Sequence, residues 1–167
     1  RDEPLLTTYY SGEKPLCEIL KELSEEELCR IIRDYSDERY AKPIAAAIAR
    51  REQQRPIMTT FKLRDAILSA VPRNYERGRI HPATRTFQAL RIYANHELEN
   101  LREVLAKLSF ILKQGGRIAV LSFHSLEDGI VKSQFRAGVS KGILKLITKK
   151  PLRPSREEIA KNPRARS

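Results

Sequence analysis

The chain has 167 residues and a net charge of +11, and its residues are 41% hydrophobic and 32% charged. This hydrophobic content excludes a disordered chain and suits one domain, or one domain with part of another. The longest apolar run, Ile118 to Phe123, is too short to cross a bilayer, and the first residues lack a signal-peptide pattern, so we expect a cytoplasmic protein without a membrane partner.

The first part of the chain carries a specific helix-start signal. Residues 1–14 are expected to be extended, with a turn at Ser11 and Gly12. Ser24 and Glu27 lie three apart and predict a capping box, in which each side chain satisfies a free backbone N–H group of the helix. The helix that they open is expected to end near Tyr35.

Two further helices are expected before the middle of the chain. One covers about residues 37–51, and Pro43 either kinks it or marks the first turn of a new helix. The other is capped by Thr59 or Thr60. Apolar side chains at helical spacing predict its buried face, namely Leu63, Ile67, Ala70 and Val71.

The longest expected helix runs from about residue 84 to 113. Its apolar side chains recur at steps of three and four, which places them on one face that should be core. They are Phe87, Leu90, Ala94, Leu98, Leu101, Leu105, Leu108 and Leu112. Gly115 and Gly116 are expected to end the helix in a left-handed conformation.

An apolar, β-rich segment from Arg117 to Phe123 predicts a strand buried on both faces. Ser125 is expected to cap a helix from Leu126 to about Arg136, and a second strand is expected over residues 143–148. This order predicts an α/β fold. Two strands do not make a stable doubly wound sheet, so we expect the rest of the sheet to lie outside this chain.

Several long blocks occur in an order that is similar to a known family. They are GRIHPATRTFQALRI at residues 78–92, GGRIAVLSFHSLED at 115–128, LITKKP at 146–151 and NPRARS at 162–167, with DERY at 37–40 as a weaker match. On these blocks the chain resembles the bacterial small-subunit ribosomal RNA (cytosine-N4)-methyltransferase H family, also called MraW, over its C-terminal part.

The resemblance implies a function and a fold. The family transfers a methyl group from S-adenosyl-L-methionine to the N4 amine of a cytidine in the decoding region of 16S rRNA in the small ribosomal subunit. Its fold is a doubly wound, Rossmann-like (class I) methyltransferase domain with an inserted, mostly helical substrate-recognition domain. On this chain, residues 1–11 would be a link from the N-terminal half, residues 12–80 the insert, and residues 81–167 the C-terminal part of the methyltransferase domain. The resemblance also allows a homodimer.

The departures from the family concern the methyl donor. The glycine-rich donor loop and its partner residues would lie upstream of Arg1, and the last strand would follow Ser167. Gly115 and Gly116 precede a predicted strand, whereas a donor loop follows one. We therefore expect no donor-binding residue in this chain, weak or absent donor binding by the chain alone, and no activity from this piece.

The first candidate site is the turn after the predicted strand 117–123. Ser122, Phe123, His124 and Ser125 would line the cytidine pocket there, because ligands of open α/β sheets bind at the carboxyl ends of strands. Ser122 or His124 would contact the base. The alternative is that Ser125 only caps a helix and that His124 is a turn residue.

The second candidate site combines Arg79, His81, Thr84 and Arg85. The arginines would clamp RNA phosphate, and the helix N-terminus near Thr84 would add an anion site. The alternative is a structural junction between the insert and the main domain.

The third candidate site is the basic end of the chain. Residues 141–167 carry nine basic and two acidic side chains, whereas residues 1–29 carry three basic and eight acidic ones. Lys149, Lys150 and Arg153, spaced by prolines, are expected to contact RNA phosphates, with a solvated basic loop as the alternative.

Other functions are less well supported by the sequence. A non-catalytic module that binds RNA or the ribosome is the main alternative. A serine hydrolase is disfavoured because no Gly-x-Ser-x-Gly motif is present. The cysteines Cys17 and Cys29 are too few for a disulfide framework or a zinc site, so they are expected to be reduced thiols without a metal.

Overall fold

The computed structural model describes residues 2–9, 12–75 and 80–165. The chain divides into two compact units, Arg1–Glu97 and Leu98–Ser167, which we call unit 1 and unit 2. The functional boundaries expected at residues 11 and 80 stay a prediction.

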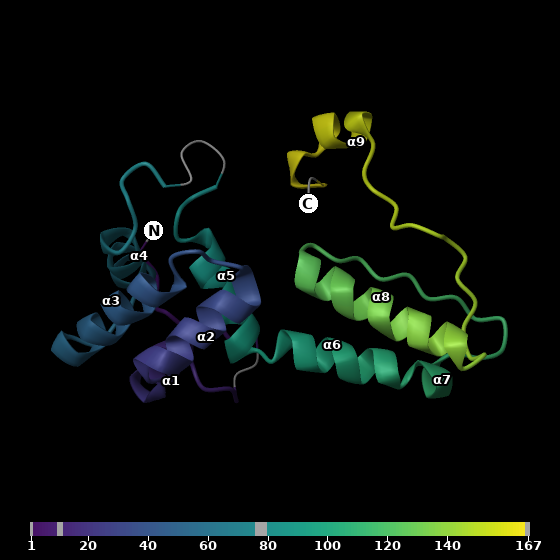
Figure 1. Ribbon diagram of the computed structural model, residues 1–167, viewed down its shortest axis with the longest axis horizontal. Coiled ribbons are helices and arrows are strands. Elements are labelled where there is room, and N and C mark those ends of the chain that lie inside the picture. The colour runs from purple at the N-terminus through teal and green to yellow at the C-terminus, as the bar shows by residue number, and fades with distance from the viewer. Residues whose placement is uncertain (1, 10–11, 76–79, 166–167) are drawn as a thin grey trace. The chain divides into compact units, whose positions relative to one another are not determined.

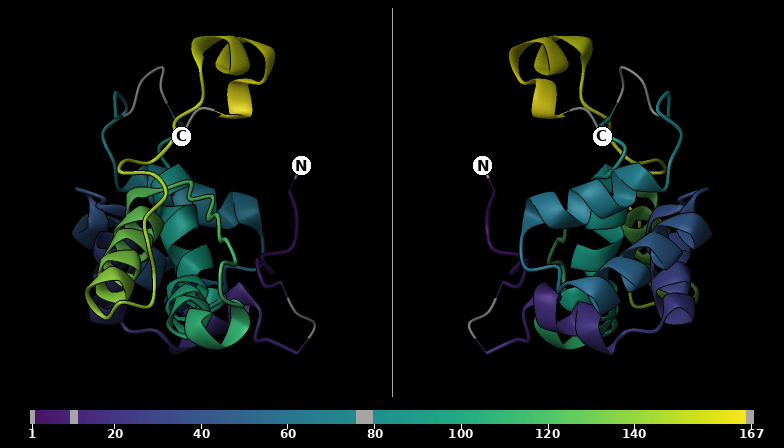
Figure 2. Two further views of the ribbon diagram at one scale, coloured as in Figure 1. Left: turned by 90° about the vertical axis from the view of Figure 1, so that its right-hand side faces the viewer. Right: turned by 90° about the vertical axis from the view of Figure 1, so that its left-hand side faces the viewer.

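Unit 1 is a bundle of helices around one apolar core (Figures 1 and 2). The helix α2 packs against both α3 and α5, and α1 also contacts α5, so the two ends of unit 1 lie together. Leu28, Ile32 and Leu90 are fully buried at these contacts. The helices are α1 (Leu16–Glu22), α2 (Glu25–Ser36), α3 (Ala41–Gln54), α4 (Thr60–Ser69) and α5 (Thr84–Ala94). Of these, α1 was not expected from the sequence.

The expected capping box at the start of α2 is confirmed. Glu27 N donates to Ser24 Oγ at 3.2 Å, and Ser24 N donates to Glu27 Oε2 at 2.9 Å. The hydrogen bonds from the Ser24 hydroxyl and backbone hold the pKa of the Glu27 carboxyl below its usual range. The helix ends at Ser36, close to the expected end, because Asp37 adopts a left-handed conformation with φ 51°.

We expect Ser24→Ala to lower the free energy of unfolding by about 1 kcal/mol, because one N–H group of the first turn loses its acceptor. Urea denaturation followed by circular dichroism measures this change. Ser24→Asn is the matched control, since asparagine also caps a helix well, and it should stay close to the unchanged chain. Equal losses in the two variants would contradict a capping role.

The helices α3 and α4 follow the expected pattern with shifted limits. Pro43 lies in the first turn of α3, where a missing N–H group is tolerated, so the second alternative is confirmed and the helix begins at Ala41, not near residue 37. Thr59 caps α4 and accepts from Lys62 N at 3.4 Å. Leu63 and Ile67 are fully buried, and Ala70 and Val71 are half-buried at the edge of the core.

The prediction of a single helix over residues 84–113 is wrong. The described chain forms α5, then α6 (Glu97–Ala106) and the short α7 (Leu108–Ile111). The break falls at Asn95 and His96, where His96 has φ 50° and cannot continue a right-handed helix. The predicted apolar face is confirmed at five of its eight positions, since Leu90, Ala94, Leu98, Leu105 and Leu108 are buried. The other three, Phe87, Leu101 and Leu112, are half-buried.

Unit 2 contains α6, α7, α8 (Ser125–Ser140), α9 (Arg156–Lys161) and a 3-10 turn at Pro163–Ala165. Gly115 has φ 79°, so the left-handed conformation expected after the long helical region is confirmed at this glycine. None of the described helices is both long and apolar enough to cross a membrane.

The α/β fold class, a partial doubly wound sheet, is contradicted by the structure. Within residues 2–9, 12–75 and 80–165 the only β pairing is an isolated bridge between Pro4 and Thr59. Residues 117–123 and 143–148 have no strand structure, and Leu121 is 79% exposed where a buried strand was expected. The physical reason is that a strand needs a neighbour for its backbone hydrogen bonds, and these two segments do not pair.

Candidate functional site

The turn formed by residues 122–125 leads directly into α8. His124, not Ser125, is the N-cap residue, so the expected cap at Ser125 is wrong by one position. Glu127 N donates to His124 Nδ1 at 3.4 Å, and Ser125 is the first residue of the helix. Because Nδ1 accepts this hydrogen bond, the neutral imidazole carries its proton on Nε2.

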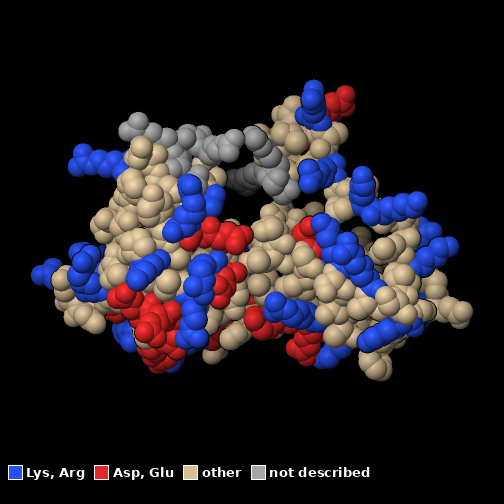
Figure 3. All heavy atoms as spheres, viewed as in Figure 1, with Lys and Arg blue, Asp and Glu red and all other residues tan. Residues whose placement is uncertain are grey.

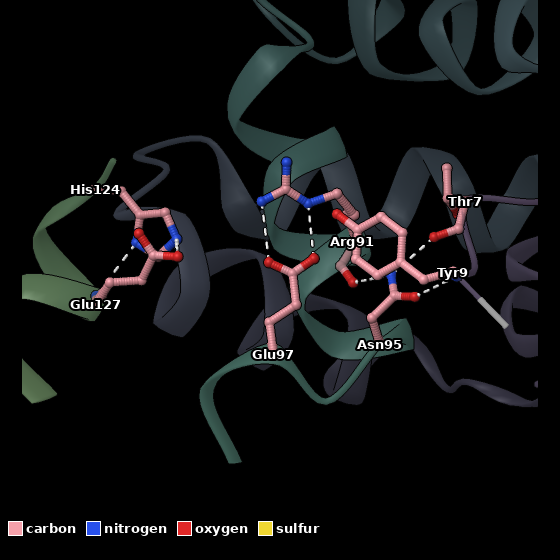
Figure 4. A network of polar contacts seen from close by, with 7 residues as sticks. All are labelled: Thr7, Tyr9, Arg91, Asn95, Glu97, His124 and Glu127. Carbon is pink, nitrogen blue, oxygen red and sulfur yellow. Dashed lines mark hydrogen bonds and ion pairs between the residues drawn. The ribbon is translucent and has the colours of Figure 1, made fainter. Parts of the chain in front are cut away.

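Glu127 fixes the other side of the same turn. Phe123 N donates to Glu127 Oε2 at 2.8 Å, so the carboxylate holds the backbone just before the cap. His124 Nε2 lies 3.5 Å from Glu127 Oε1, and the imidazole is only 13% exposed (Figure 4). Phe123, by contrast, is 64% exposed. The turn therefore buries the histidine ring and presents the phenylalanine ring to solvent.

A groove of about 300 Å³ lies between α6 and α8 within unit 2. Of the four residues expected around the cytidine pocket, Ser125 lines this groove. Arg102, Ser133 and Gln134 also line it and were not singled out from the sequence. The sequence predicts these helices from their apolar positions. It does not predict which polar side chains face a groove, because that depends on which helix packs beside them.

The second expected cluster is present only in part. Arg79 lies outside the described residues. His81 and Thr84 are exposed, and His81 Nδ1 accepts from Ala83 N at 3.2 Å. The N-cap residue of α5 is Ala83, whose side chain makes no cap hydrogen bond, and the first residue of the helix is Thr84. Arg85 is half-buried.

The third expected cluster is fully exposed. Lys149, Lys150 and Arg153 lie in a segment without regular structure between α8 and α9. Their unit is the basic part of the chain: residues 98–167 contain fifteen basic and six acidic side chains, against seventeen and fifteen in residues 1–97. Figure 3 shows the corresponding blue spheres over unit 2 and the acidic patch near α1 and α2 in unit 1.

Sequence reasoning missed a buried polar residue, Asn95, that holds unit 1 together. Tyr9 N donates to Asn95 Oδ1 at 2.9 Å, and Asn95 Nδ2 donates to Thr7 O at 2.8 Å (Figure 4). Beside it, Arg91 forms a two-point ion pair with Glu97 at 2.8 and 3.0 Å. No local signal identifies these partners, because Thr7 and Tyr9 lie more than eighty positions away from Asn95.

The model of the MraW methylase family matches residues 10–167. The chain belongs to the MraW methylase family. The family resemblance read from the sequence blocks is thereby confirmed.

Among curated members of the MraW methylase family, the chain is similar to proteins called Ribosomal RNA small subunit methyltransferase H. The protein from Thermotoga neapolitana is 50% identical over 171 residues, which cover 100% of this chain and 55% of that relative. The protein from Koribacter versatilis is 49% identical over 159 residues, or 95% of this chain and 46% of that relative. The chain thus spans about half the length of these relatives.

Proposed function

We propose that the protein takes part in methyl transfer from S-adenosyl-L-methionine to the N4 amine of a cytidine in 16S rRNA. The observation that carries the proposal is the family match over residues 10–167, together with relatives named as small-subunit rRNA methyltransferases. The net charge of unit 2 supports a polyanionic partner. A cytoplasmic location and a homodimer stay predictions.

The turn at residues 122–125 is the proposed cytidine contact. Methyl transfer to an amine needs orientation more than covalent catalysis, so the site requires a stacking surface and polar groups that fix the base. The exposed ring of Phe123 suits stacking, and Ser122 supplies a polar atom beside it. His124, whose Nε2 is buried in this chain, stays a proposed contact to the base. His81, Thr84 and Arg85 are proposed to hold flanking phosphates.

The groove between α6 and α8 does not fit the donor. S-adenosyl-L-methionine carries a sulfonium cation and a ribose diol, which a carboxylate would hold best. None of the described residues that line the groove is acidic, and Arg102 would repel the sulfonium. The donor is therefore not expected in this groove.

The proposal is tested on a full-length relative that contains the sequence HSLED, incubated with small ribosomal subunits and methyl-labelled donor. Digestion of the rRNA and mass spectrometry of the nucleosides should give N4-methylcytidine. Label on another base, on another atom of cytidine, or on protein would contradict the proposal.

The second candidate function, an RNA-binding module without catalysis, is favoured by the poor fit of the groove to the donor. The methylation assay on the full-length relative separates the two functions, whereas calorimetric titration of this chain with S-adenosyl-L-methionine tests only whether the chain holds the donor by itself. We expect no measurable heat of binding from the chain alone. Tight binding would contradict the expectation that the donor site lies elsewhere in the full-length protein.

Lys149 and Lys150 are proposed to bind RNA phosphates. Lys149→Ala with Lys150→Ala should weaken RNA binding and reduce the slope of log Kd against log salt concentration by about 1.4, since each lost phosphate contact on single-stranded RNA removes about 0.7. Fluorescence anisotropy at several salt concentrations measures this slope. An unchanged slope would reject phosphate contacts at these two lysines.

A further inference from the structure

The segment from α8 toward α9 has an unusual charge distribution. Residues 129–156 carry eight basic side chains and no acidic one. An even spread of the chain's 21 acidic residues would place three or four of them there. An ordinary solvated surface mixes both signs, so this one-signed segment indicates an anionic partner.

Three of these cations lie at the C-terminal end of α8 and just after it. Arg136, Lys141 and Lys145 are exposed, and we call them the basic strip. In the part of the chain that the structure describes, no ion pair joins any of the three to a carboxylate. Lys132, one turn earlier on α8, differs because it is paired with Asp128. The basic strip therefore keeps its full charge available for a ligand.

The backbone of the basic strip is held in place by a local turn. The carbonyl oxygen of Gly138 accepts from Ile143 N at 2.9 Å and from Leu144 N at 3.2 Å. Gly142, with φ 69°, allows the chain to reverse at this point. A Cβ atom on Gly138 would lie 2.6 Å from Leu144 Cδ1, so the missing side chain lets the returning segment pack on α8. Lys141 and Lys145 thus project from a fixed turn, not from a loose tail.

Apolar side chains alternate with these cations on the same segment. Ile143 is 53% exposed and Ile147 is 70% exposed, on either side of Lys145. A surface that combines cations with accessible apolar groups suits a single RNA strand, whose phosphates bind the cations while sugars and bases contact apolar groups.

We propose that Arg136, Lys141 and Lys145 form a phosphate-binding site for the RNA strand, continuous in sequence with Lys149 and Lys150. The inference rests on the proposed function in that the ligand is RNA. It extends the proposed RNA contact from the segment after residue 148 back onto α8, which has no buried residue. The phosphates of the RNA strand would then be bound from the C-terminal end of α8 through Lys150.

The test replaces all three cations, as Arg136→Gln, Lys141→Gln and Lys145→Gln, in the whole chain. Binding of a single-stranded oligonucleotide of 16S rRNA sequence is measured at several salt concentrations. We expect the slope of log Kd against log salt to fall by about 2, from three lost phosphate contacts at about 0.7 each. Circular dichroism checks that the helix content is kept. If the triple variant loses it, Lys145→Gln alone, outside any helix, should still lower the slope by about 0.7.

A control with the same change of charge comes from the first part of unit 2, outside the expected substrate-recognition insert. Lys107→Gln, Lys113→Gln and Arg117→Gln remove three exposed cations around α7 and should leave the slope nearly unchanged. Equal slopes in the two triple variants would overturn the proposal, because net charge alone would then explain binding. The proposal would also be overturned if the Arg136, Lys141 and Lys145 triple variant bound anionic lipid vesicles less well than the unchanged chain but bound RNA equally well.

The methylation assay separates this inference from the proposed function. RNA binding through the basic strip without any N4-methylcytidine in the full-length relative would refute only the proposed function. Methylation with an unchanged salt slope in the triple variant would refute only the basic strip.

Discussion

Asn95→Ala should lower the free energy of unfolding of unit 1 by about 3 kcal/mol. The side chain of Asn95 is 3% exposed and contacts Tyr9 N, Thr7 O and Arg91 O. Truncation removes the Asn95 side chain from Tyr9 N and Thr7 O, whereas Arg91 O keeps its hydrogen bond from Asn95 N. Each buried group that is left unsatisfied costs about 1–3 kcal/mol. Urea denaturation followed by circular dichroism measures the total loss, and amide hydrogen exchange at Tyr9 reports the local one.

Two control variants separate these hydrogen bonds from general effects of substitution. Gln53→Ala removes an exposed amide from α3 and should change stability by less than about 0.5 kcal/mol. Asn95→Asp turns the donor toward Thr7 O into an acceptor, so burial and the facing carbonyl raise the pKa of the new carboxyl. Its destabilisation should therefore shrink as pH falls, when protonation restores a donor. A pH-independent loss would contradict the assigned hydrogen bonds.

Elements with a local chemical cause could be predicted from the sequence. The capping box at Ser24, the cap at Thr59 and the left-handed Gly115 each depend on residues within a few positions. The buried leucine stripe likewise follows from helical periodicity, which survives the break between α5 and α6.

Features that depend on distant partners could not be predicted. The break after Ala94 is accompanied by Asn95 binding a segment more than eighty positions earlier, which no window of sequence contains. The apolar segment 117–123 has the composition of a strand, yet composition does not supply a pairing neighbour. At the candidate turn, the usual preference for serine as a helix cap favours Ser125, and only the geometry shows His124 in that position.

His124→Ala should lower the methylation rate of a full-length relative with the sequence HSLED by about 100-fold, if the imidazole orients the base as proposed. His124 also caps α8, so a loss of activity from alanine alone has two explanations. His124→Asn separates them, because asparagine is a strong helix cap but lacks the imidazole. If His124 orients the base, the His124→Asn variant should methylate as slowly as the alanine variant, with an unchanged thermal unfolding temperature. Recovery of the rate by asparagine would assign His124 a capping role only.

The affinity of the His124 variants for the donor is a second readout, measured by calorimetry. It should not change in either variant, and an equal loss of methylation rate and donor affinity would place His124 at the donor.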